Sequence, residues 1–130
     1  MAKPSISIRI HAIDLDLQHA LDDALRDTGL TISQWRTLEA VREMPGASGA
    51  ELARANAVTA QSMHTTLTGL ERAGLVVRQP HAVHGRIVQV YLSNAGERRL
   101  EAGRAEVQSV EERLLAGLSA NERELLAGLL

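Results

Sequence analysis

Hydrogen-bonding side chains recur within one short segment near the middle of the chain. They are Gln61, Ser62, His64, Thr65 and Thr68. Between them, apolar residues follow the i, i+4, i+7 spacing of a buried helical stripe, at Met63, Leu67 and Leu70. The major groove of B-DNA is about 12 Å wide and accepts one α-helix, from which a glutamine can read adenine and a threonine methyl can touch thymine. The segment is therefore typical of a helix that reads duplex DNA.

Capping signals set the ends of this helix and of its neighbours. Thr59 can cap the helix at its N-terminus, and Gly74 can end it in a left-handed conformation that other residues disfavour. Three further helices open with capping-box spacing, and they begin near Thr31, Ser48 and Ser119. We therefore expect the DNA-reading helix to cover residues 59–73.

A β-hairpin follows the predicted DNA-reading helix. Residues 75–78 and 86–92 have the composition of two strands, with a turn at 80–85 between them. Helix, short helix, tight turn, polar-faced helix and hairpin, in that order, make the winged helix-turn-helix plan. The hairpin, or wing, would place Arg86 against phosphate or in the adjacent minor groove.

The net charge of −2 conceals a basic centre between two acidic ends. From residue 48 to residue 92 the only acids are Glu51 and Glu71. The basic residues and histidines of this stretch are Arg54, Arg72, Arg78, Arg86, His64, His81 and His84. Because cationic side chains that neutralise phosphates supply most of the non-specific affinity for DNA, we expect the four arginines of the centre to contact DNA.

Long amphipathic helices are predicted at both ends of the chain. The first isoleucines alternate as a strand would, but helical spacing continues from Ile10 to Leu25, and we favour a helix over residues 8–28 that Gly29 ends. Residues 94–130 follow the same helical pattern. The apolar faces exceed what the small central module can cover, so we expect them to meet a second copy. The predicted fold is mainly α with a small antiparallel β-hairpin, assembled as a homodimer.

Composition argues against several other classes of protein. The aromatic content is 2%, too low for the stacking platforms of single-stranded nucleic-acid binding. With no cysteine, the chain has no disulfide framework or thiolate metal cluster. Neither a signal peptide nor a membrane span is evident, and we expect a cytoplasmic protein. Because the phosphate-binding loops, metalloprotease helices and nucleophile elbows of enzymes are missing, we expect no enzymatic activity and no cofactor.

Five sequence blocks, in order along the chain, carry a resemblance to a known family. They read LTISQW (30–35), SGAELA (48–53), VTAQS (58–62), LERAGLV (70–76) and LSNAG (92–96). On these blocks the chain resembles the MarR (multiple antibiotic resistance regulator) family of bacterial dimeric repressors and activators.

The resemblance implies a single domain over residues 1–130 and a division of labour within it. Terminal helices at 8–28 and 94–130 would hold the dimer, and residues 31–92 would form the winged helix-turn-helix. The helix 59–73 would recognise DNA and Arg86 would tip the wing. Members of the family often respond to a small aromatic or phenolic effector, so the resemblance implies a ligand-responsive regulator, for which we favour repression.

Two positions depart from the pattern of the family. The wing arginine usually follows an aspartate two residues earlier, where this chain has His84, so the wing would be looser or sensitive to pH. The recognition helix carries Thr65 and Thr66 where relatives commonly have a basic residue. The second departure removes a phosphate contact and predicts a modest affinity for DNA.

Ligand-binding candidates are Trp35, which the resemblance puts near the effector pocket, and two histidines of the first helix, His11 and His19. Trp35 can equally be a core residue. The two histidines lie among aspartates that could hold a metal, although a hydrated acidic face explains them as well. A pair at His81 and His84 lacks the third and fourth ligands that zinc takes, and we expect no metal.

A second function suits the same elements. A winged helix can bind a protein rather than DNA, in which case the polar face of helix 59–73 would meet a protein surface or only solvent. The basic centre favours DNA, and the salt dependence of binding to duplex DNA distinguishes the two hypotheses.

Overall fold

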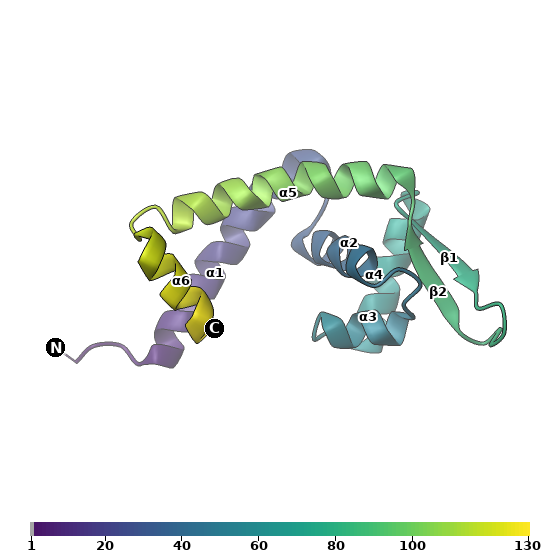
Figure 1. The fold of residues 1–130 in the computed structure, drawn as a ribbon, viewed down its shortest axis with the longest axis horizontal. Coiled ribbons are helices and arrows are strands. Elements are labelled where there is room, and N and C mark those ends of the chain that lie inside the picture. Colours follow the sequence, from purple (N-terminus) through teal and green to yellow (C-terminus); the bar gives the residue numbers. More distant parts are fainter. Residues whose placement is uncertain (1) are drawn as a thin grey trace.

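A computed structural model describes residues 2–130. The main elements in chain order are α1 (Ile6–Leu25), the 3-10 helix η1 (Arg26–Thr28), α2 (Ile32–Glu43), α3 (Gly49–Ala55), α4 (Ala60–Arg72), β1 (Val76–Pro80), β2 (Val88–Leu92), α5 (Asn94–Leu114) and α6 (Ala120–Leu129). The two strands pair antiparallel, with Val76 opposite Leu92 and Pro80 opposite Val88. Figure 1 shows the hairpin projecting from one end of the molecule and both termini at the other.

The capping residues act as the sequence predicts. Thr31, Ser48 and Ser119 each form a capping box. The hydroxyl of the capping residue accepts the backbone N–H of the third helical residue, and the side chain of that residue accepts the backbone N–H of the capping residue. Thr59 accepts a hydrogen bond from the backbone N–H of Ser62 and starts α4. These side chains satisfy backbone donors that the first turn of a helix leaves without partners.

Three predicted elements have boundaries that are wrong by one or a few residues. The first helix begins at Ile6 rather than near residue 8, because the Ser5 hydroxyl accepts the backbone N–H of Ile8 as an N-cap. The first strand is shifted, running from Val76 to Pro80 rather than over 75–78. The second strand begins at Val88 rather than at residue 86, since the preceding residues form a turn.

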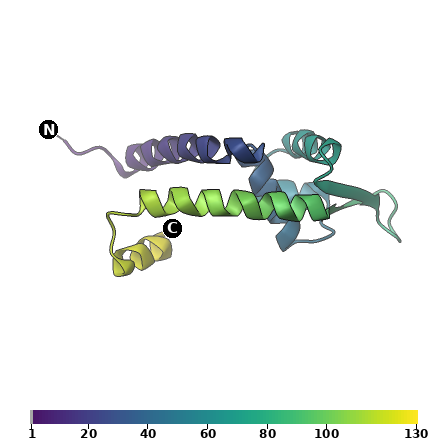
Figure 2. The ribbon, with the colours of Figure 1, turned by 90° about the horizontal axis from the view of Figure 1, so that it is seen from above.

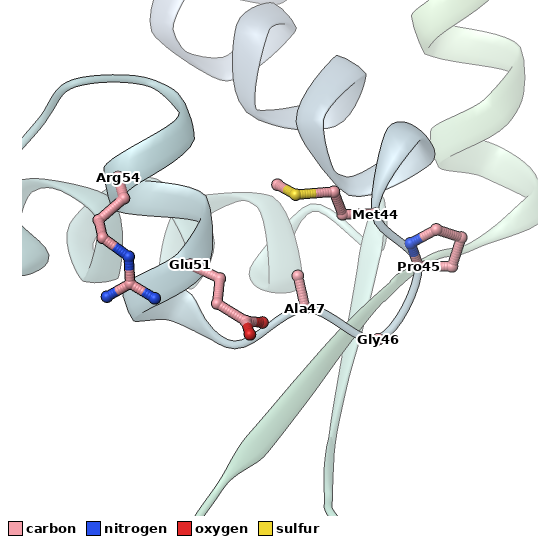
Figure 3. Close-up of a pocket in the computed structure, with 6 residues that line it drawn as sticks. All are labelled: Met44, Pro45, Gly46, Ala47, Glu51 and Arg54. Atoms are coloured by element: carbon pink, nitrogen blue, oxygen red, sulfur yellow. The ribbon is translucent and has the colours of Figure 1, made fainter.

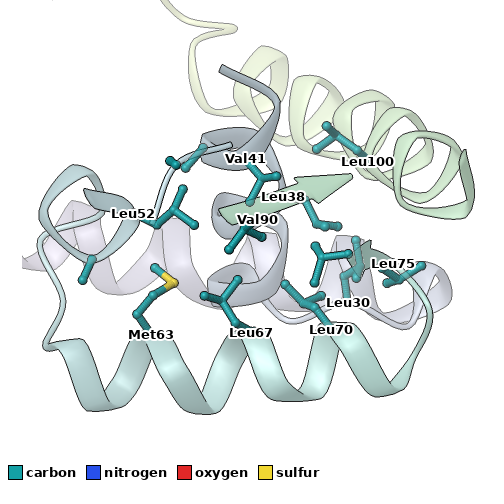
Figure 4. Close-up of a cluster of buried hydrophobic side chains, with 14 residues drawn as sticks. Leu30, Leu38, Val41, Leu52, Met63, Leu67, Leu70, Leu75, Val90 and Leu100 are labelled. Atoms are coloured by element: carbon teal, nitrogen blue, oxygen red, sulfur yellow. The ribbon is translucent and has the colours of Figure 1, made fainter. Parts of the chain in front are cut away.

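The core of the winged helix-turn-helix is built from aliphatic side chains of every element between α2 and β2 (Figure 4). Leu38, Leu52, Leu67 and Leu70 are almost completely buried there. Leu100 of α5 reaches into the same cluster, so this helix is packed against the module and not merely linked to it. Burial of these leucines, worth about 1.5–3 kcal/mol each, is the main stabilising contribution.

A second cluster joins the two long helices. Figures 1 and 2 show α1 and α5 side by side, with the winged module at one end of α5 and α6 at the other. Leu21 and Leu25 of α1, Ile32 of α2 and Val110 of α5 are buried together, and Trp35 packs against both clusters. Trp35 therefore lies where the winged module, α2 to β2, meets the helical arm formed by α1 and α5.

Large apolar side chains lie exposed on α1 and α6. On α1 the exposed residues are Ile6, Ile8, Ile10, Ile13 and Leu15. On α6 and just beyond it they are Leu125, Leu126, Leu129 and Leu130. A monomer rarely exposes so many large aliphatic side chains together. Within residues 2–130 no helix has both the length and the apolar character needed to cross a bilayer.

Candidate nucleic-acid interface

The side chains of α4 divide into distinct faces. Successive residues of a helix are about 100° apart, so residues 61, 65 and 72 point away from residues 63, 67 and 70. Met63, Leu67 and Leu70 are buried in the core. Gln61, Thr65 and Arg72 are exposed on the opposite side. The helix thus carries two hydrogen-bonding side chains and one cation on its outer face.

The start of α4 adds further polar groups to this surface. Thr59, Gln61 and Ser62 are all exposed at this end of the helix. The hydroxyl of Thr59 is engaged as the N-cap, and that of Thr65 donates to the carbonyl of Gln61 at 3.1 Å. The side chains of Gln61 and Ser62, by contrast, make no recorded hydrogen bond within residues 2–130.

A different face of α4 turns towards the wing and is held by Arg78 of β1. The Nη2 group of Arg78 donates to the Thr68 hydroxyl at 2.8 Å and to the Glu71 carboxylate at 3.3 Å. Its Nη1 group lies 3.4 Å from Nδ1 of His64. Only 17% of the Arg78 side chain is exposed. The structure therefore brings three of the predicted DNA contacts, His64, Thr68 and Arg78, together with one another.

Arg54 and Arg72 lie on separate parts of the surface. Arg54 is exposed on α3 and borders a shallow hollow beside the loop from Met44 to Ala47 (Figure 3). In that view Glu51, from the same helix, lines the hollow together with Arg54. Arg72 is exposed near the end of α4, and no hydrogen bond or ion pair is recorded for it within residues 2–130.

Arg86 is exposed in the turn that joins the two strands. The backbone N–H of Ile87 donates to the carbonyl of His84 at 2.8 Å, which closes a four-residue turn with Arg86 at its third position. No acidic partner for Arg86 is recorded within residues 2–130. Arg86 also lines a groove between the wing and α3, together with Glu51 and Gln89.

Two arginines and two glutamates tie the winged module to α5. Arg104 contacts Glu39 at 2.5 Å and Glu101 at 3.8 Å, while Arg42 contacts Glu101 at 2.6 Å and Glu39 at 3.7 Å. Each carboxylate thus lies between two guanidinium groups. No sequence pattern predicts this cluster, because Arg104 and Glu39 are 65 residues apart and meet only when α2 packs on α5.

The three ligand-binding candidates do not form one site in the described structure. Trp35 is half-buried and its Nε1 group lies 3.4 Å from the carbonyl of Leu100. It also borders a shallow, largely apolar hollow shared by α2 and the end of α3. His11 and His19 are exposed on α1, and neither lines this hollow. Across residues 2–130, no group of three histidine or carboxylate side chains is placed to hold a metal.

One ionisable side chain has a clearly shifted pKa. The pKa of Glu122 lies below its usual value, first because the backbone N–H of Ser119 donates to the carboxylate at 2.9 Å and second because of the Ser119 hydroxyl. Hydrogen bonds to the charged form of a carboxyl favour that form. The shift belongs to the cap of α6 and lies outside the polar face of α4.

The fold and its polar helix define a winged helix-turn-helix protein of the DNA-binding class. A model of the MarR family matches residues 28–87. The chain is 33% identical over 114 residues to the HTH-type transcriptional repressor Rv2887 of Mycobacterium tuberculosis, covering 88% of this chain and 82% of that protein. The chain therefore belongs to the MarR family of transcription regulators, and it is not an enzyme.

Solved structures resemble almost the full length of the chain. The crystal structure of Rv2887 from M. tuberculosis in complex with DNA has 30% sequence identity and a TM-score of 0.83, covering 98% of this chain and 96% of that one. Rv2887 in complex with salicylic acid has the same identity and a TM-score of 0.80, covering 98% and 94%. A mutant MarR from Escherichia coli in complex with operator DNA has 25% identity and a TM-score of 0.88, covering 95% and 89%.

Proposed function

We propose that this chain is a homodimeric repressor that reads a pseudo-palindromic operator. Residues 59–73 would enter the major groove, and the wing would place Arg86 against phosphate or in the adjacent minor groove. One observation carries the proposal: Gln61 and Thr65 are exposed on the side of α4 opposite its buried leucines. Two relatives have been crystallised with DNA, which supports the same use of the helix here.

The exposed aliphatic residues of α1 and α6 support the homodimer. Ile6 is 76% exposed and Leu129 is 84% exposed, although both side chains are strongly apolar. A second copy would cover these helices and leave the two α4 helices to approach successive major grooves, about one helical turn of DNA apart. Each winged module would then bind one half of the operator.

A small aromatic or phenolic compound would regulate the dimer. Trp35 supports this proposal, since it packs between the winged module and the helical arm and borders a shallow hollow. His11 and His19 remain candidates on α1, and a relative has been crystallised with salicylic acid. An effector that binds one arrangement of module and arm better than another would change the distance between the two α4 helices and so the affinity for DNA.

Binding to duplex DNA over a range of salt concentrations tests the proposed function. Fluorescence anisotropy with a random duplex should show an affinity that falls steeply with salt, and selection from a randomised pool should recover a two-fold symmetric sequence. The alternative, a winged module that binds a protein, requires no salt-dependent association with DNA. The absence of any such association in the intact dimer would overturn the proposed function.

A further inference from the structure

The tip of the wing is closed by a ring of three hydrogen bonds that includes a side chain. The backbone N–H of His81 donates to the carbonyl of Ile87 at 2.8 Å, and the N–H of Ile87 donates to the carbonyl of His84 at 2.8 Å. The N–H of His84 donates in turn to Nδ1 of the His81 ring at 3.0 Å. Arg86 lies inside the segment that this ring closes.

The ring of His81 accepts a second backbone donor. The N–H of Val83 lies 3.1 Å from the same Nδ1 atom. In turns, the side-chain oxygen of an aspartate or asparagine commonly accepts the backbone N–H of a residue shortly after it in the same way. His81 therefore does in this wing what a short carboxylate or amide does elsewhere, with a group that can titrate.

From this geometry we infer that the neutral imidazole of His81 positions Arg86 for DNA. The aspartate that usually precedes the wing arginine is replaced by His84, and no carboxylate is recorded on Arg86 within residues 2–130. The backbone around Arg86 is instead fixed through His84 and Ile87, both of which belong to the hydrogen-bonded ring. His81 is a positioning residue, and its consequence for DNA rests on the proposed function.

The inference requires that Nδ1 of His81 carry no proton. A protonated imidazole has two N–H donors and no acceptor, so it cannot receive the bonds from Val83 and His84. Histidine changes charge between about pH 5 and 8, and a second proton on His81 would open the tip of the wing.

The charged and titratable groups that face His81 are few. The ring centroids of His81 and His84 are 5.2 Å apart. His81 and Arg86 both line a groove between the wing and α3. Among the α3 residues that line this groove, the charged one is Glu51, and its carboxylate already accepts the backbone N–H of Ser48 at 2.9 Å.

Nuclear magnetic resonance on the free protein tests the hydrogen-bond arrangement without DNA. At pH 8 the nitrogen signals of His81 should report the proton on Nε2, and on acidification the amide signals of Val83 and His84 should move together with the His81 ring. In His81→Asn the asparagine oxygen can accept the same two N–H groups but takes up no proton. The changes of the Val83 and His84 amide signals that follow the His81 ring should therefore disappear. His84→Gln is the matched control and should keep them. A proton on Nδ1 at pH 8 would overturn the inference.

A double-mutant cycle at pH 8 tests the positioning of Arg86. His81→Ala should weaken binding to a selected duplex several-fold, and His81→Asn should restore most of it. In the background of Arg86→Ala, the change His81→Ala should have no further effect, since the contact it serves is gone. Additive losses would overturn the positioning role. If the wild-type dimer binds no duplex at all, the proposed function fails, while the spectra still decide the arrangement of the wing.

Discussion

Arg78 of β1 donates a hydrogen bond to the hydroxyl of Thr68 on α4, with 2.8 Å between Nη2 and Oγ1. The same guanidinium reaches Glu71, one turn further along the helix. The wing and the helix proposed to read DNA are therefore joined by one largely buried side chain. Contacts of this side chain therefore help to set the orientation of the wing relative to the helix.

Replacement of Arg78 by alanine should destabilise the protein. A hydrogen bond to a charged group contributes about 1.5–3 kcal/mol, and partial exposure of Glu71 brings the expected loss in unfolding free energy to about 1–2 kcal/mol. Chemical denaturation measures this loss. Arg72→Ala is the matched control, since Arg72 is an exposed arginine, and it should leave stability unchanged while flattening the salt dependence of DNA binding by about one unit. Unchanged stability in Arg78→Ala, together with a loss of stability in Arg72→Ala, would contradict a structural role for Arg78.

The outer face of α4 should determine which DNA sequence is chosen. The double change of Gln61→Ala and Thr65→Ala removes both hydrogen-bonding side chains from the face of α4 opposite the core and leaves the core untouched. A bidentate contact to a base contributes about 1–3 kcal/mol of discrimination, so preference for the selected duplex over a random one should largely vanish. Competition binding measures the preference, and sedimentation confirms that the dimer persists. Unchanged preference would show that another element reads the bases.

How much the sequence could predict depends on how local each feature is. The caps at Thr31, Ser48 and Thr59 were predictable, because each involves residues only three positions apart. The contacts of Arg78 and Arg104 were not, because they require the packing of separate elements. The sequence predicts His64, Thr68 and Arg78 as separate DNA contacts, and their contacts with one another depend on the packing of β1 against α4.

Gly103 shows how packing overrides local preference. Glycine within a helix costs about 1 kcal/mol relative to alanine, which makes its presence in α5 unfavourable in isolation. A Cβ at this position would overlap Cδ1 of Trp35, so the close approach of α5 to α2 requires glycine. Gly103→Ala should therefore destabilise the protein by about 1–3 kcal/mol and shift the fluorescence of Trp35.

Gly69→Ala is the control for Gly103. A Cβ at Gly69, also within a helix, would meet only the Gln34 amide at 3.9 Å, an ordinary contact. The gain in helix propensity should then appear as a stabilisation of up to about 1 kcal/mol. Thermal unfolding of the two variants should give shifts of opposite sign. A shift of the same sign in both would contradict the close packing of α5 on Trp35.

The cap of α6 should respond to acid. The pKa of Glu122 is lowered in the folded chain, so its contribution to stability is present above the ordinary carboxyl value of about 4.3 and is lost as the pH falls through the lowered value. Ser119→Ala keeps the backbone N–H but removes the hydroxyl, and should raise the pKa of Glu122 towards its usual range. Carbon chemical shifts of the carboxyl group measure this directly. An unchanged pKa would mean that the hydroxyl has no part in the shift.

The aliphatic surface of the terminal helices should control assembly. Ile10 is 56% exposed on α1, and a glutamate there would place a charge where the second copy is proposed to pack. Ile10→Glu should weaken the dimer at least about tenfold, equivalent to 1.4 kcal/mol, and weaken binding to the two-fold symmetric duplex with it. Ser7→Glu adds the same charge at a polar position of the same helix and should leave the dimer intact. Analytical ultracentrifugation measures the dimer in both variants. If Ile10→Glu leaves the dimer unchanged, the interface lies elsewhere, because burying an unpaired charge within it would cost free energy.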